Sequence, residues 1–126
     1  MPLDETYVSY LNSQSKGRLA TIAPDGTPQN KPVGFSYNAE LGTIDIGGFN
    51  NATSAKYKNI ASHPAVSFVV DDAVGEGAAG MRFLEIRGAA EQVGEPDNLI
   101  RIHPRRVVSW NLGGGEASFS SQDLAG

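Results

Sequence analysis

The spacing of hydrophobic side chains changes from a helical period to a period of two near Gly17. Residues 3–15 carry apolar side chains at helical spacing, which predicts a short N-terminal helix. From residue 18 onward apolar and polar positions alternate, as in half-buried strands. Strands are predicted over 18–23, 28–38 and 43–47, the second broken at Pro32 because proline cannot donate to a ladder. Turns at 24–27 and 40–42 favour antiparallel hairpins.

The second half of the chain predicts one more helix and three more strands. Thr53 is expected to cap a helix of about two turns that ends at His63-Pro64. Further strands are predicted over 65–70, 82–93 and 99–112, the last interrupted at Pro104, and residues 71–80 are expected to form a flexible loop. Gly88 is expected to be a bulge or a point of close approach.

About six short strands with turn residues between them favour a mainly β fold, a small antiparallel barrel rather than a sandwich. Residues 1–112 form the single domain of this interpretation, and the Gly- and Ser-rich residues 113–126 form a C-terminal tail. A barrel of this size fills its interior with side chains. A large ligand is therefore expected outside it, in a groove or at a subunit interface.

Composition excludes several classes of protein. There is no cysteine among the 126 residues, which excludes disulfides, thiolate metal sites and cysteine nucleophiles. The apolar runs are far shorter than the roughly 18 residues of a membrane span, and the acidic start does not resemble a signal peptide. We expect a cytoplasmic protein without membrane contact. A net charge of −4 argues against nucleic acid as a partner.

The distribution of charge says more than its sum. Five of the ten Lys and Arg residues lie in two windows without acids, 46–70 and 98–115. One interpretation is an ordinary solvated surface. The other is a local anion site built from both windows. The segment from Thr43 to Pro64 is predicted to form a strand, a loop and a helix. The backbone amides of the loop and first helical turn, together with Lys56, could bind a phosphate. An ordinary capped helix with exposed lysines explains the same pattern equally well.

Motifs of independent catalysis are absent from the sequence. His63 and His103 both precede proline and have no partner at metal-ligand spacing, so a structural or surface role is preferred for each. There is no nucleophile elbow, no P-loop and no dinucleotide fingerprint. If the protein is an enzyme, a cofactor is expected to carry the chemistry.

Five segments together resemble a known family. In order they are GRLATIAPDGTPQNKPVGFSYN, TIDIGGFN, AKYKNIASHPAVSFVVDD, LEIRGAAE and IRIHPRRVVSWNL. Their order and spacing resemble the pyridoxamine-phosphate-oxidase-like split barrels over residues 17–112. Within these, the chain looks most like the small actinobacterial branch that uses the deazaflavin coenzyme F420, in the subgroup that includes dehydrotetracycline reductases.

The resemblance implies a six-stranded antiparallel split β-barrel of the FMN-binding type, a homodimer, and two cofactor sites at the dimer interface. It implies that one strand lies along the flavin-type ring and that the loop and helix hold the phosphate. The implied cofactor-binding residues are Lys31, Pro32, Val33, Gly34, Asn50, Asn51, Thr53, Ser54, Lys56 and Lys58, with Arg105, Arg106 and Trp110 of the partner subunit closing the site. The family often has an arginine near the helix start, where this chain has Ser54 and Ala55. The alternatives are a weaker affinity for the phosphate, or substitution of the arginine by Lys58 or Lys31.

The implied function is an oxidoreductase that transfers a hydride from the reduced deazaflavin to a conjugated double bond of a bulky small-molecule substrate. The two basic windows suit this coenzyme, which carries a phosphodiester and a carboxylate tail. FMN, with only a terminal phosphate, is the alternative cofactor of an oxidase or reductase on the same barrel. A non-catalytic protein that binds a flavin-like or tetrapyrrole ligand is the remaining alternative. For Trp110, packing in the core or dimer is slightly preferred over contact with the ring.

Overall fold

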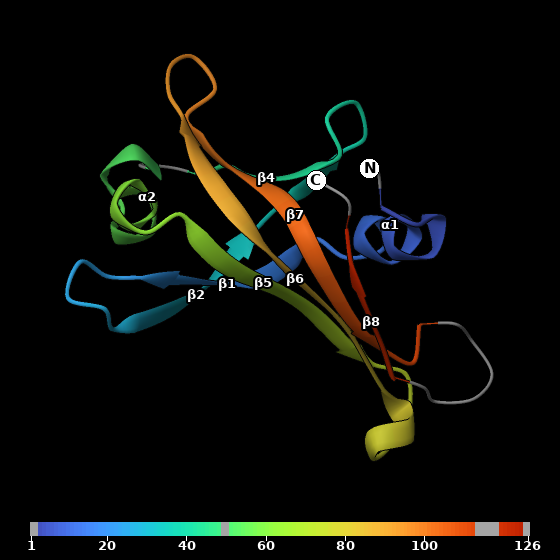
Figure 1. Ribbon diagram of the computed structural model, residues 1–126. Coiled ribbons are helices and arrows are strands. Elements are labelled where there is room, and N and C mark those ends of the chain that lie inside the picture. The colour runs from blue at the N-terminus through green and yellow to red at the C-terminus, as the bar shows by residue number, and fades with distance from the viewer. Residues whose placement is uncertain (1–2, 49–50, 113–118, 125–126) are drawn as a thin grey trace.

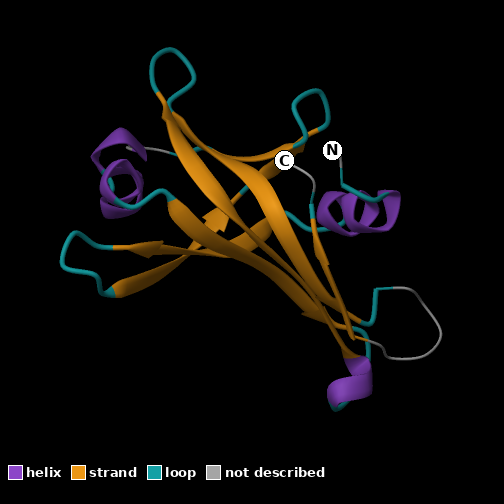
Figure 2. Ribbon diagram, in the orientation of Figure 1, coloured by secondary structure: helices purple, strands orange, loops and turns teal. Residues whose placement is uncertain are grey.

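The computed structural model describes residues 3–48, 51–112 and 119–124. Two α-helices and two short 3₁₀ helices accompany a sheet of short and long strands (Figures 1 and 2). In chain order the elements are α1 (Glu5–Asn12), β1 (Lys16–Ile22), β2 (Pro28–Gly34), β3 (Ser36–Asn38), β4 (Thr43–Ile46), η1 (Asn51–Thr53), α2 (Ala55–Ser62), β5 (Ala65–Ala73), η2 (Ala78–Gly80), β6 (Met81–Val93), β7 (Leu99–Trp110) and β8 (Phe119–Asp123).

The sheet closes on itself through a bend between two strands. Its order is β2-β1-β5-β6-β7-β4-β3, and β8 pairs with β7 off this path. Only Phe35 separates β2 from β3, so the two ends of the order are halves of one bent strand. Within the described residues, β1, the β2–β3 strand, β4, β5, β6 and β7 make up the ring, and all of the pairings are antiparallel. The predicted mainly β, antiparallel barrel is confirmed, although the described residues form eight strands and not six, because one ring strand is divided into β2 and β3 and β8 is added beside β7.

The two prolines expected to interrupt strands do not interrupt them. Pro32 pairs with Arg18 within β2, and the break falls instead at Phe35. Proline is tolerated there because β2 has a hydrogen-bonded neighbour on one side only. Pro104 lies within a continuous β7, between the residues that pair with β4 (100–102) and those that pair with β8 (106–110). Neither β4 nor β8 pairs with Pro104, so the missing N–H leaves no ladder bond unmade on that edge of β7.

The bulge expected at Gly88 is confirmed. The β6–β7 register shifts between Arg87 and Gly88, because Arg87 lies opposite Arg106 and Gly88 lies opposite Pro104. A Cβ on Gly88 would lie 2.2 Å from the His103 carbonyl oxygen, so only glycine fits here without movement of the backbone.

Mostly aliphatic side chains from the strands of the ring fill the interior of the barrel. Phe68 is fully buried and packs edge-on against Phe35, with ring centroids 5.0 Å apart. A Cβ on Gly17 would lie 2.5 Å from the ring of Phe68, so the glycine at the start of β1 makes room for this pair. The fully buried side chains include Leu19, Ile44, Ile46, Leu84, Ile86, Ile100, Ile102 and Val107.

A buried ion pair holds β4 against β7. Arg101 donates to both carboxylate oxygens of Asp45, at 3.1 and 3.2 Å, and the two side chains are only 18% and 11% exposed. Thr43 and Asn38 also donate to this carboxylate. Burial raises the pKa of Asp45, but these bonds outweigh burial and hold the pKa below its ordinary value.

A second network attaches α1 to the β5–β6 hairpin. The Tyr10 hydroxyl donates to Asp72 at 2.9 Å, and Arg82 forms a two-pronged pair with the same carboxylate. The Arg82 guanidinium also lies 5.0 Å from the centre of the Tyr10 ring. Burial and the bond to Asp72 raise the pKa of Tyr10.

The start of the second helix differs by one residue from the prediction. Ser54, not Thr53, is the cap of α2, and its hydroxyl accepts from the Tyr57 N–H at 3.3 Å. Thr53 belongs to the 3₁₀ turn η1 that precedes it. The helix ends at His63, as expected.

Regular structure occurs in the segment named as a C-terminal tail and in the loop expected over 71–80. Residues 119–123, which the sequence assigned to a C-terminal tail, form β8 on the outer side of β7. Residues 71–73 extend β5, and residues 78–80 form η2. Among the described residues no helix is long and apolar enough to cross a membrane.

Candidate functional site

A cavity of about 300 Å³ lies between β2 and the beginning of α2. Four residues of the expected cofactor site line it, namely Lys31, Pro32, Ser54 and Lys56. Thr21, Gln29 and Ala55 complete its lining. The structure thus brings together the strand and the helix that the family resemblance assigned to one site.

The β1–β2 register explains why these side chains meet. Leu19 lies opposite Lys31, and Thr21 lies opposite Gln29. Gln29 and Lys31 are two residues apart on one strand, so they point to the same face. That face is the side on which α2 packs, because the Asn59 amide of the helix reaches both Thr21 and Gln29.

The electrostatics of this cavity suit an anion. Lys31 and Lys56 both line it, and no carboxylate does. Within the described part of the chain, neither lysine forms an ion pair. Two ammonium groups at one opening are a charge-assisted binding site for a group such as phosphate.

Asn59 connects the helix to the polar floor of the cavity. Its side chain is 5% exposed, and its Nδ2 donates to Thr21 Oγ1 at 3.0 Å and to Gln29 Oε1 at 2.9 Å. Thr21 is 2% exposed. Both residues are therefore held in one orientation by a buried amide.

Other expected site residues have different positions. Lys58 is exposed on α2 and does not line the cavity. Val33 is buried in the barrel core, and Gly34 follows it at the end of β2, so their side chains offer no group to this cavity. Thr53 is exposed in η1. Asn50 lies outside the described residues.

Asn51 has a structural role in this arrangement. Its side chain is 3% exposed, and its Nδ2 donates to the carbonyls of Ile46 and Asn98. It thereby ties η1 to the end of β4 and to the turn between β6 and β7.

The three expected residues of the last strand are separated from the lysines within one chain. Arg106 pairs with Asp123 and also donates to Ser121 of β8. The Trp110 indole donates to the Ala78 carbonyl at 2.8 Å. Arg105 lines a different hollow, of about 470 Å³, on the outer face of the barrel. None of the three lines the Lys31–Lys56 cavity.

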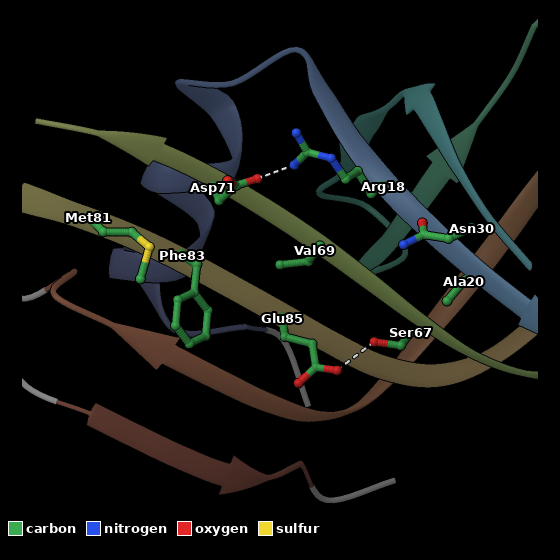
Figure 3. Close-up of a pocket in the computed structure, with 9 residues that line it drawn as sticks. All are labelled: Arg18, Ala20, Asn30, Ser67, Val69, Asp71, Met81, Phe83 and Glu85. Carbon is green, nitrogen blue, oxygen red and sulfur yellow. Dashed lines mark hydrogen bonds and ion pairs between the residues drawn. The ribbon is translucent and has the colours of Figure 1, made fainter. Parts of the chain in front are cut away.

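The outer face of β1, β5 and β6 carries a second hollow of about 450 Å³ (Figure 3). Val69 and Phe83 form its apolar floor, and a Ser67–Glu85 bond of 2.5 Å lies at one side. Burial raises the pKa of Glu85, but the bonds from Arg87 and Ser67 outweigh it and leave that pKa below its ordinary value. We name the surface formed by these two outer hollows the open face.

Sequence reasoning missed Thr21, Gln29 and Asn59. Gln29 could have been found, since it is two residues before Lys31 on a predicted strand and shares its face. Thr21 follows from Gln29 once the turn at 24–27 sets the register of the hairpin. For Asn59 there was no signal, because an asparagine on a short helix is ordinarily a solvated residue.

The fold is a split barrel, and a cavity lined by two lysines lies between β2 and the beginning of α2. The sequence matches the family described as pyridoxamine 5'-phosphate oxidase over residues 3–111. It is 38% identical over 123 residues to a 5a,11a-dehydrotetracycline/5a,11a-dehydrooxytetracycline reductase of Streptomyces rimosus, and the match covers 90% of this chain and 87% of that protein. The chain therefore belongs to the pyridoxamine 5'-phosphate oxidase family.

Solved structures share this fold. A conserved hypothetical protein from Mycobacterium tuberculosis superposes with a TM-score of 0.73 at 25% identity, over 98% of this chain and 93% of that one. A pyridoxamine 5'-phosphate oxidase-related, FMN-binding protein from Nostoc punctiforme gives a TM-score of 0.65 at 13% identity, over 100% of both chains.

The comparisons confirm the expected family and the expected relation to dehydrotetracycline reductases. The expected enzyme class, an oxidoreductase, is confirmed at the level of the relative, which is named a reductase. Dependence on a deazaflavin stays a prediction.

Proposed function

We propose that the Lys31–Lys56 cavity binds the phosphate of a flavin-type cofactor and that the protein is a reductase of a bulky organic substrate. The observation that carries this proposal is the pair of lysines at a cavity without carboxylates. The family membership and the reductase at 38% identity support the class of reaction.

The deazaflavin coenzyme F420 is the cofactor we favour. Its phosphodiester and carboxylate tail offer more negative charge than the terminal phosphate of FMN, and the basic residues of 46–70 and 98–115 match that charge. FMN is the second candidate, because the FMN-binding protein of Nostoc punctiforme has the same fold over its whole length.

In this proposal β2 positions the ring and α2 holds the phosphate. Strand β2 has no neighbour on its outer edge, so the backbone of Pro32, Val33 and Gly34 is open to a flat ring. Lys31 and Lys56 bind the phosphate next to it. When bound and reduced, the deazaflavin supplies a hydride to a polarised double bond. No Asp, Glu, His or Tyr lines the cavity, so we expect the proton to come from solvent or the substrate.

We further propose that the protein is a homodimer joined through the open face. Val69 and Phe83 give this face an apolar floor. A second copy docked there would cover it and would bring Arg105, Arg106 and Trp110 of the partner subunit toward the cofactor. Light scattering at micromolar concentration is expected to give the mass of a dimer, and a monomer would contradict the proposal.

A charge placed on the open face tests the dimer and the site together. Val69→Arg is expected to give a monomer that binds the cofactor more weakly. The matched control is Leu41→Arg, which adds the same charge at a side chain that is 54% exposed on a different part of the surface. Dissociation by both variants, or full cofactor affinity in a Val69→Arg monomer, would refute the shared interface.

The cofactor is tested by fluorescence titration with the deazaflavin coenzyme and with FMN. Tighter binding of the deazaflavin is expected, and equal or tighter binding of FMN would favour the second candidate. Stopped-flow oxidation of the reduced coenzyme by a panel of conjugated enones then tests the reaction. If a coenzyme binds and no acceptor is reduced, a cofactor-binding protein without catalysis is the better description.

A further inference from the structure

The Lys31–Lys56 cavity has more hydrogen-bond donors than acceptors, and the buried helix residue Asn59 is the reason. Thr21 Oγ1 and Gln29 Oε1 both accept a hydrogen bond from Asn59 Nδ2. Both oxygens therefore face the helix and not the cavity. The Thr21 hydroxyl proton and the Gln29 Nε2 group remain available to donate to a ligand in the cavity. Within the described residues neither of them donates to the chain.

Ser54 behaves differently from these two side chains. Its hydroxyl donates to the Asn51 carbonyl at 2.7 Å and accepts from the Tyr57 N–H, so both of its roles are filled inside the chain. Among the described residues, the unfilled side-chain donors of the cavity are thus the Thr21 hydroxyl, the Gln29 amide and the ammonium groups of Lys31 and Lys56.

We infer that Asn59 is a positioning residue: it directs the Thr21 hydroxyl and the Gln29 amide so that they donate into the cavity, which makes the cavity selective for the deprotonated oxygens of a phosphate. This inference rests on the proposed function of the site. The orientation of the Asn59 amide decides which groups of Thr21 and Gln29 face the cavity, as its reversal would show. The Asn59 oxygen would then accept from Gln29 Nε2 and from the Thr21 hydroxyl, and the Gln29 oxygen would face the cavity. An acceptor there repels the phosphate oxygens that the present arrangement would bind.

Asn59→Asp imposes that reversed arrangement, because a carboxylate only accepts hydrogen bonds. The readout is the ratio of affinities for a phosphate-bearing cofactor and for its phosphate-free core. The probes are the deazaflavin coenzyme with its ribityl core, and FMN with riboflavin. For the pair that binds, Asn59→Asp is expected to lower this ratio at least about tenfold, the effect of one hydrogen bond to a charged group, while affinity for the core stays the same.

Two controls separate polarity from charge and from folding. Ser62→Asp adds the same charge at an exposed position of the same helix, outside the cavity lining, and is expected to leave the ratio unchanged. Thr21→Val removes the donor without adding charge and is expected to lower the ratio, whereas Thr21→Ser keeps the hydroxyl and should preserve it. The Thr21 pair tests the donor that Asn59 leaves unfilled, so an unchanged ratio in Thr21→Val overturns the inference even if Asn59→Asp fails to fold.

Each outcome has one meaning. An unchanged ratio in both Asn59→Asp and Thr21→Val, alongside a lowered ratio in Lys56→Ala, overturns the role of Asn59 and leaves the phosphate site standing. Equal loss of affinity for the phosphate-bearing probe and its core shows a structural role and also overturns it. If the wild-type protein prefers neither phosphate-bearing probe to its core, the proposed phosphate site fails and the inference fails with it.

Discussion

Replacing Lys56 by alanine tests whether this lysine binds the cofactor phosphate. The lysine lies in the first turn of α2, lines the cavity with Lys31, and has no carboxylate partner among the described residues. Its removal deletes one charge-assisted bond, which is worth about 1.5–3 kcal/mol of binding free energy. Coulomb's law brackets this value, since two unit charges 4 Å apart interact by about 1 kcal/mol in water and about 4 kcal/mol near a protein surface.

The dissociation constant of the cofactor should therefore rise between about 10-fold and 150-fold in Lys56→Ala. The free energy of unfolding should change by less than about 0.5 kcal/mol, because the Lys56 side chain forms no ion pair with the described residues. Fluorescence titration and urea denaturation measure the two quantities. Raising the salt concentration should weaken wild-type binding more than variant binding, because salt screens the attraction between the Lys56 charge and the phosphate, and the variant lacks this attraction. The Debye length is about 10 Å at 0.1 M salt.

Lys58→Ala is the matched control, because Lys58 belongs to the same helix but lies outside the cavity. It should leave the dissociation constant nearly unchanged. Equal weakening by both variants would mean that a diffuse positive surface, not a built cavity, attracts the cofactor. No weakening by Lys56→Ala would refute the reasoning altogether.

Three further predictions concern stability and are measured by urea denaturation. Arg101→Leu leaves the buried Asp45 carboxylate without its cation and should cost about 3 kcal/mol of unfolding free energy at neutral pH. The lowered pKa of Asp45 stabilises the wild-type fold above about pH 4, and this contribution is lost as the pH falls through the folded-state pKa. The cost of Arg101→Leu should therefore shrink in acid, and a cost that is the same at every pH would contradict this. Gly88→Ala should cost about 1–3 kcal/mol because of the clash with the His103 carbonyl, whereas Gly94→Ala, with open space around it, should change little; equal effects would contradict the close approach.

Local patterns in the sequence were enough to predict most elements of the barrel. Alternation of apolar and polar residues defined the strands, since side chains on a strand point to opposite faces. Gly88 was identified as a close approach because a glycine inside a long strand is costly without such a reason. Lys56 was named from an acid-free window and Lys31 from the family resemblance, and both line one cavity.

Only the tertiary structure decided which parts of the chain meet. The ring closes because the strand from Pro28 to Asn38 bends at Phe35 and pairs with β1 on one half and β4 on the other, a geometry that no local pattern encodes. Pro104 is tolerated because two different strands flank it. Asn59 reaches Thr21, 38 residues earlier in the chain, because α2 packs against β1. Contacts across such separations depend on sheet register and helix docking, which are set by the packing of the whole core and not by the spacing of nearby residues.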